Sequence, residues 1–185
     1  AAAVQVGPDA QAAVVSLNKH SGLSHGKVCR VLRDTYGIHL TRGGSAQIVL
    51  RAGRRCTPHF REILTHVRHS PRVTPDETGW KVAGRPQWLW AFVTKAATLD
   101  VVRPSRGKAV IEEVLGAAYA GELVHDGWRS DEILTAARHQ TCLRHLLVRC
   151  RNLLATATRG AVRFPRAVKA LLRDALALRD RRDAE

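Results

Sequence analysis

The stretch Gln87-Trp-Leu-Trp-Ala-Phe-Val93 decides the fold class of this chain. Alternate residues of a β-strand point to opposite faces, and here one face carries Trp88, Trp90 and Phe92 while the other carries Leu89, Ala91 and Val93. A strand that is apolar on both faces is typical of the buried centre of a sheet. The preceding Gly84-Arg-Pro86 indicates a turn. We therefore expect a sheet that holds this segment inside it.

The segments on either side extend this strand into an α/β pattern. Strands are also predicted from Val73 onward, over Thr98–Val102, over Glu122–His125 and over His139–Leu143. Helices are predicted over Lys108–Ala118, Ser130–Arg138 and Arg144–Thr156, and after Pro165, where Val168, Leu171, Leu172, Ala175 and Leu176 would share one face. A three-stranded meander followed by alternating helices and strands predicts an α/β fold with a mixed sheet flanked by helices, in the order of the ribonuclease H-like fold.

The beginning of the chain differs from the rest in charge and periodicity. Residues 1–72 carry eleven Lys and Arg against three acids, and their apolar residues recur at helical spacing. Helices are predicted over Asp9–Lys19, from Ser24 to a Gly37 cap, and from Thr41 with Ile48, Val49 and Leu50. Three short helices in a basic segment are typical of a helix-turn-helix DNA-binding unit. Gly43-Gly44 weakens the third helix, and small helical bundles of other function share the pattern.

The positive net charge of the chain indicates a negatively charged partner. Thirty Lys and Arg against sixteen Asp and Glu leave a formal charge of +14, which suits a polyanion such as nucleic acid. Twenty-four of the thirty cations are Arg, whose planar donor fork matches phosphates and guanine edges. A GC-rich genome also favours Arg codons and explains much of this ratio, but it does not explain the net charge.

The sequence disfavours other classes of protein. Lys or Arg interrupts every apolar run before it is long enough to cross a membrane, so no membrane partner is expected. Four irregularly spaced cysteines do not form a disulfide framework, which makes a reduced, cytoplasmic protein the default. The sequence contains no Met, so we expect a fragment or a processed chain.

Two acids follow strand candidates at positions suited to metal chemistry. Asp76 is expected at the end of the first strand candidate, in Val73–Trp80, and Asp126 at the end of the fourth, in Gly121–Trp128. If these strands are neighbours, about 4.8 Å apart, the two carboxylates converge at one end of the sheet. Paired carboxylates bind Mg²⁺ or Mn²⁺, and such ions activate a water or a 3′-hydroxyl for phosphodiester cleavage. Both residues also lie near a glycine, so turn residues without catalytic function are the alternative.

Five ordered blocks resemble transposases of the IS66 type, which are bacterial insertion-sequence enzymes with a DDE motif and a ribonuclease H-like nuclease core. The blocks are Asp76–Gly84, Trp88–Trp90, Pro104–Gly107, Glu122–Gly127 and Cys142–Leu146, and the similarity extends from about Val6 to about Arg182. By this resemblance, Asp76 and Asp126 match the first two catalytic acids, and both bind the metal, Mg²⁺. The resemblance also implies double-stranded DNA as the partner, namely transposon ends and target, and a homo-oligomer in the active complex.

The chain departs from the family pattern at several positions. The family's third acid is a Glu that follows an inserted helical region, whereas Arg144–Arg159 contains no acid and Asp174 lies in what resembles that insertion. A tyrosine usual after the second Asp is replaced by Asp131 or Glu132, and the family's cysteine-rich zinc segment is absent. We therefore expect a C-terminally truncated fragment with little or no activity, whose third acid lies beyond Glu185.

The expected organisation has three parts. Residues 1–71 form a helical DNA-binding segment, residues 72–157 a partial ribonuclease H-like catalytic core, and residues 158–185 the start of the helical insertion. Eight arginines are expected to contact DNA: Arg42, Arg51, Arg54, Arg55, Arg103, Arg106, Arg144 and Arg149. For the pair Arg103 and Arg106, solvated loop charges are the alternative.

Three functions are compatible with this sequence. The first is a transposase fragment that binds transposon-end DNA and, when intact, cleaves and transfers strands in the bacterial cytoplasm, in association with the nucleoid. The second is a non-catalytic DNA-binding remnant or regulator. The third is a basic protein that binds structured RNA. Metal-dependent nicking of DNA separates the first from the second, and a preference for structured RNA would favour the third.

Overall fold

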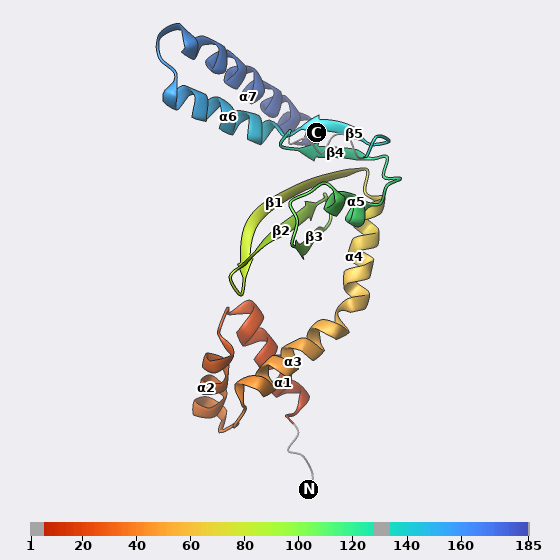
Figure 1. The fold of residues 1–185 in the computed structure, drawn as a ribbon, viewed down its shortest axis with the longest axis vertical. Coiled ribbons are helices and arrows are strands. Elements are labelled where there is room, and N and C mark those ends of the chain that lie inside the picture. Colours follow the sequence, from red (N-terminus) through yellow and green to blue (C-terminus); the bar gives the residue numbers. More distant parts are fainter. Residues whose placement is uncertain (1–5, 128–133, 185) are drawn as a thin grey trace. The chain divides into compact units, whose positions relative to one another are not determined.

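The computed structural model describes residues 6–127 and 134–184, and the chain divides into two compact units, Ala1–Glu62 and Ile63–Glu185 (Figure 1). The division falls inside a single helix, α4 (Thr57–His69). Each unit has a hydrophobic core of its own.

The N-terminal unit is a small bundle of helices. α1 (Pro8–Val15) continues through one π-helical turn (Ser16–His20) and is followed by α2 (His25–Tyr36), α3 (Arg42–Arg55) and the first turns of α4. The core side chains come from α1, α2 and α3 and are at most 3% exposed: Val14, Val28, Leu32 and Ile48. The helical periodicity predicted from the sequence is therefore confirmed in this unit.

Local capping explains where α2 and α3 begin and where α2 ends. The Ser24 hydroxyl accepts a hydrogen bond from Lys27 N–H at 3.4 Å, and Thr41 Oγ1 accepts one from Gly44 N–H at 3.0 Å. α2 ends at Gly37, which adopts the left-handed conformation (φ +66°) that favours glycine.

The core position predicted for Leu50 was wrong. Its side chain is 53% exposed, whereas Ile48 is buried. Successive residues of a helix are about 100° apart, so three consecutive residues cannot share one face.

The C-terminal unit is built on a five-stranded mixed sheet. Its strands are β1 (Arg72–Val82), β2 (Arg85–Val93), β3 (Thr98–Arg103), β4 (Glu122–His125) and β5 (Arg138–Thr141), in the spatial order β3-β2-β1-β4-β5. β1, β2 and β3 form an antiparallel meander, while β4 pairs parallel with β1 and β5 pairs parallel with β4. This order and these directions are those of the ribonuclease H-like fold, which confirms the predicted fold class.

Helices connect and flank these strands. α5 (Ala109–Leu115) lies between β3 and β4 in the chain, α6 (Leu143–Thr156) follows β5, and a 3-10 turn (Arg159–Val162) leads into α7 (Arg163–Ala184). α6 and α7 pack against each other as a hairpin (Figure 1). None of the described helices combines the length and the apolarity needed to span a bilayer.

The strand β2 is less deeply buried than its sequence predicted. Its aromatic face packs in the core with α5, and Trp90 and Phe92 are at most 3% exposed. On the opposite face Val93 is 42% exposed, because the core cluster contains no side chain from that face. The middle of the sheet is β1, which lies between β2 and β4.

Two predicted elements near the end of the sheet differ from the structure. A helix was predicted over Ser130–Arg138. Residues 130–133, which include Asp131 and Glu132, lie outside the described residues, and the rest forms a turn that runs into β5. The strand predicted over His139–Leu143 stops at Thr141, because Cys142 is already the N-cap of α6.

Two helical predictions also need correction. The helix predicted over Lys108–Ala118 stops at Leu115, because Gly116 leaves the helical conformation with φ +88°. In α7, Leu171 is 69% exposed and Ala175 is exposed as well. The half-buried apolar positions are Val168, Leu172 and Leu176, which recur every four residues.

The start of the β1–β4 pairing is fixed by a buried tyrosine. The Tyr119 hydroxyl donates to Ser70 O at 3.0 Å, and Glu122 N–H donates to Pro71 O at 2.8 Å. Burial, and then the charge of Glu122, raise the pKa of Tyr119, so its hydroxyl keeps the proton that it donates. A Cβ at Gly121 would lie 2.3 Å from the Tyr119 hydroxyl and 2.9 Å from Pro71 O. Only glycine therefore fits at the entry to β4.

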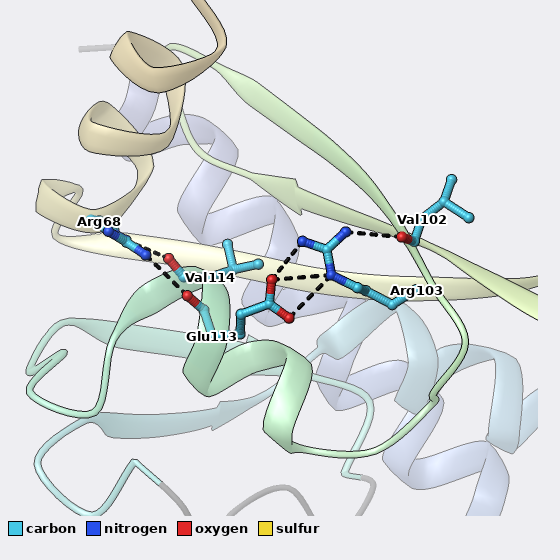
Figure 2. A network of polar contacts seen from close by, with 5 residues as sticks. All are labelled: Arg68, Val102, Arg103, Glu113 and Val114. Carbon is cyan, nitrogen blue, oxygen red and sulfur yellow. Dashed lines mark hydrogen bonds and ion pairs between the residues drawn. The ribbon is translucent and has the colours of Figure 1, made fainter. Parts of the chain in front are cut away.

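Two arginines hold α5 in place (Figure 2). Arg68 of α4 donates to Val114 O at 2.6 Å and to Glu113 O at 3.0 Å, which satisfies carbonyl groups at the end of the helix. Arg103, the last residue of β3, donates to both carboxylate oxygens of Glu113 at 2.5–3.1 Å. The hydrogen bonds from Arg103 lower the pKa of Glu113. Because this ion pair is half-exposed, it contributes to positioning more than to stability.

We predict that Gly121→Ala destabilises the C-terminal unit by about 1–3 kcal/mol, because the added methyl group overlaps the Tyr119 hydroxyl and a backbone oxygen. Urea unfolding followed by tryptophan fluorescence measures this, since all four Trp lie after residue 62. The matched control is Gly160→Ala, where a Cβ meets nothing within 4 Å. Equal stability of the two variants would contradict the proposed fit at the entry to β4.

Candidate functional site

The two acids identified from the sequence line the same pocket in the C-terminal unit. β1 pairs with β4 through Arg72 opposite Glu122 and Val73 opposite Leu123, so the partners are fifty positions apart. Carried forward from these two pairs, the same offset would bring Asp76 and Asp126 to neighbouring positions, and both residues line one pocket. The pocket is small, about 20 Å³, and is lined by Pro75, Asp76, Glu77, Trp90, Arg106, Lys108, Ile111, His125 and Asp126.

Asp76 was predicted at the end of its strand but lies inside β1, because the pairing with β2 continues beyond it as far as Val82 and fixes its backbone opposite Ala91. Its Oδ1 accepts a hydrogen bond from Glu77 N–H at 3.0 Å, and the residue is exposed. The carboxylate is therefore oriented by its own strand while it stays accessible to solvent.

Asp126 lies in a turn directly after β4 that is held by backbone hydrogen bonds. His125 O accepts from Cys142 N–H at 2.7 Å, which ties the end of β4 to the start of α6. Arg149 of α6 donates from its guanidinium to Asp126 O. Gly127 follows with φ +82°, a conformation that favours glycine. The position of the Asp126 side chain thus depends on α6 as well as on the sheet.

Next to Asp126, two histidines form an ordered chain of hydrogen bonds. Because Gly127 N–H donates to His125 Nδ1 at 3.1 Å, neutral His125 carries its proton on Nε2. That nitrogen lies 3.4 Å from His139 Nδ1, and His139 Nε2 lies 3.2 Å from Leu134 O. One direction of donation satisfies all three contacts, from His125 through His139 to Leu134 O. This chain fixes the His125 ring, which is only 6% exposed.

Two cations line the pocket together with the acids. Arg106 Nε donates to Glu77 Oε1 at 2.7 Å, and its guanidinium lies 5.0 Å from the centre of the Trp88 ring. Lys108, directly before α5, is the second cation. Cations and carboxylates in one pocket suit a phosphodiester that binds together with a metal ion.

Lys108 was not predicted from the sequence as a residue of the site. The only feature of the sequence that could have pointed to Lys108 is its place directly after the Pro104–Gly107 block. A lysine in a loop carries no pattern that separates it from an ordinary solvated charge, so only the fold reveals its place in the pocket.

The eight arginines expected at the DNA are divided between the two units, four on α3 and four in the C-terminal unit. Of the eight, Arg106 alone lines the pocket that contains the two acids. Arg103 is paired with Glu113, and Arg149 is bound to the Asp126 turn. The others are exposed, one on α6 and four on α3: Arg144, Arg42, Arg51, Arg54 and Arg55. Contact of these side chains with DNA stays a prediction.

The donors of the pocket fit a hard divalent cation. Mg²⁺ and Mn²⁺ take oxygen ligands, often one or two carboxylates together with phosphate oxygens, and Asp76 and Asp126 can supply the carboxylates. Glu77 is bound by Arg106, and His125 Nδ1 by Gly127 N–H. Within residues 6–127 and 134–184, no group of three or more His, Cys, Asp or Glu side chains is placed to hold a metal.

Comparison with known proteins gives one family match. The family model described as "Transposase IS66 family" matches residues 3–177. No curated protein matches the chain. Among solved structures, a chain of a simian T-cell lymphotropic virus intasome in complex with PP2A regulatory subunit B56 gamma is similar, with 11% identity, a TM-score of 0.32 and coverage of 82% of this chain and 66% of that one. A likeness this weak carries no argument about function.

We predict that Arg149→Met destabilises the C-terminal unit by about 0.5–1.5 kcal/mol, since it leaves Asp126 O without its charged donor. The amide of Gly127 should also exchange its hydrogen faster, because the turn loosens. Arg151→Met is the control, as Arg151 is exposed on the same helix. Identical exchange at Gly127 in both variants would show that Arg149 does not hold the turn.

Proposed function

The chain belongs to the IS66 transposase family, since the family match covers residues 3–177, and we propose that it carries a DDE-type nuclease site acting on DNA. Residues 1–71 form the DNA-binding segment of this proposal, residues 72–157 the catalytic core, and residues 158–185 the start of a helical insertion. The DNA is the transposon end and the target, and the active complex is a homo-oligomer.

The observation that carries the proposal is the shared pocket of Asp76 and Asp126. Both carboxylates line this pocket, and oxygen ligands of this kind are those that a hard divalent cation prefers. DDE transposases use divalent metal ions, and we propose Mg²⁺ or Mn²⁺ bound by these two acids.

In this proposal, each side chain of the pocket has its own role. When bound, the metal ion activates a water or a 3′-hydroxyl and stabilises the leaving oxygen of the cleaved phosphodiester. Asp76 and Asp126 hold the ion, while Arg106 and Lys108 neutralise and orient the phosphate. Glu77 keeps the Arg106 guanidinium in position through their ion pair. Trp90 Nε1 donates to Ser105 O at 3.1 Å and thereby fixes the loop that carries Arg106.

We predict that Asp76→Asn and Asp126→Asn each weaken Mn²⁺ binding by at least about tenfold, because each removes one charged ligand. Titration calorimetry of the full chain with MnCl₂ measures this. Asp100→Asn is the matched control, because Asp100 is an exposed aspartate on β3. Binding that is unchanged in both site variants, or weakened equally in the control, would contradict a metal site at these two acids.

A second candidate function is DNA binding without cleavage, as in a remnant or regulator. The charge of residues 1–72, with eleven Lys and Arg against three acids, favours it, because binding driven by phosphate contacts needs no metal. Incubation with supercoiled plasmid and MnCl₂ separates the two candidates. Nicking that disappears in Asp76→Asn supports the transposase, while retardation of uncut plasmid by a chain that also binds no Mn²⁺ at the two acids supports the second candidate.

A further inference from the structure

We propose that a basic pocket in the N-terminal unit binds a phosphate group of the duplex DNA backbone. The pocket has a volume of about 490 Å³ and lies between α2 and α3. Its charged lining consists of Arg30 and Arg33 from α2 and Arg42 from α3, and His39 of the connecting segment also lines it. This inference rests on the proposal that the N-terminal unit binds DNA, and it adds the site and the chemical group that the site takes.

The beginning of α3 contributes to this α2–α3 pocket. Thr41 and Arg42, the cap and the first residue of the helix, both line it. The first N–H groups of a helix have no partner within the helix and form the positive end of its dipole. Thr41 Oγ1 satisfies the N–H of Gly44, and Gly43 presents no side chain above the helix end. A phosphate in the pocket would therefore meet backbone donors in addition to guanidinium groups.

Arg42 reaches across to α2 because residue 26 is a glycine. A Cβ on Gly26 would lie 3.2 Å from Arg42 Nε and 3.6 Å from its guanidinium carbon. The Arg42 side chain thus packs against the backbone of α2. A larger residue at position 26 would displace it from the pocket without changing the charge of the protein.

The lining of the pocket is cationic and has no acid of its own. It contains three arginines and no Asp or Glu. Asp34 binds Arg33 Nε at 2.9 Å, but both side chains are more than half exposed, so this pair is weak. Three guanidinium groups around one cavity repel one another, and an anion that accepts hydrogen bonds from them relieves this repulsion.

The arrangement of α2 and α3 favours a backbone phosphate as the anion. In helix-turn-helix units, the second helix enters the major groove with its N-terminal residues, and the first helix crosses the backbone. The α2–α3 pocket lies at that junction, because Thr41 and Arg42 begin the second helix. Contacts to phosphate carry no sequence information, so the pocket would fix the position of α3 on DNA of any sequence.

Fluorescence anisotropy with a labelled duplex of arbitrary sequence tests the proposal on the full chain. In Arg30→Ala/Arg42→Ala, the slope of log affinity against log salt should fall by about 0.9, because the pocket neutralises one phosphate and each neutralised phosphate contributes about 0.9. The control Arg166→Ala/Arg173→Ala removes the same charge from exposed positions of α7. Gly26→Leu keeps every charge and should also weaken binding, while helix formation at α2 is preserved or improved.

Each outcome of this experiment supports or overturns one statement. If the unaltered chain does not bind the duplex, the proposed DNA-binding function of the N-terminal unit fails. If it binds and the pocket variants behave like the α7 control, DNA binding stands and the pocket assignment is overturned. Calorimetry with inorganic phosphate tests the other source of the anion. Phosphate binding that duplex DNA does not compete with would identify a small-anion site and also overturn the proposal.

Discussion

The parallel pairing of β1 with β4 is the constraint on which the candidate site depends. A shift of this pairing by one residue would turn Asp126 to the opposite face of the sheet. The pairing itself covers few residues, because β4 is only four residues long. Its register is therefore set where the strands begin, by the Tyr119 hydroxyl on Ser70 O and by the close approach that Gly121 allows. The same contacts at the start of β1 and β4 therefore stabilise the fold and align the two acids.

Around this pairing, the helices position the groups of the pocket. α6 holds the Asp126 turn through Arg149 and through the Cys142 amide, and the histidine chain holds the ring of His125. α5 is fixed by Arg68 and Arg103, and Lys108 stands at its beginning. Several arginines of this strongly basic chain therefore serve the protein's own backbone and acids. The α2–α3 pocket differs from them because its arginines surround a cavity.

The sequence was sufficient for the order of the strands, because strand periodicity and the ordered family blocks are local signals. The same blocks pointed to Asp76 and Asp126, whose catalytic role stays a prediction. It could not reveal the contact of Tyr119 with Ser70, whose residues are 49 positions apart. Nor could it show that Arg103 and Arg149 are bound by Glu113 and Asp126 O, since a sequence shows a charge but not its partner. The open face of β2 and the exposed Leu171 were missed because burial depends on which elements cover a surface, not on hydrophobicity alone.

The central claim is that the register of β1 and β4 brings residues 76 and 126 together, and a disulfide tests it most directly. Asp76→Cys/Asp126→Cys would be made with the four native cysteines replaced, oxidised, and analysed by mass spectrometry of proteolytic peptides. Because a disulfide needs Cα atoms within about 4.4–6.8 Å, the account predicts a 76–126 cross-link. It also predicts much less cross-linking in Thr78→Cys/Asp126→Cys, whose positions are two residues out of register. Equal cross-linking of both pairs, or none at 76–126, would contradict the register and with it the candidate site.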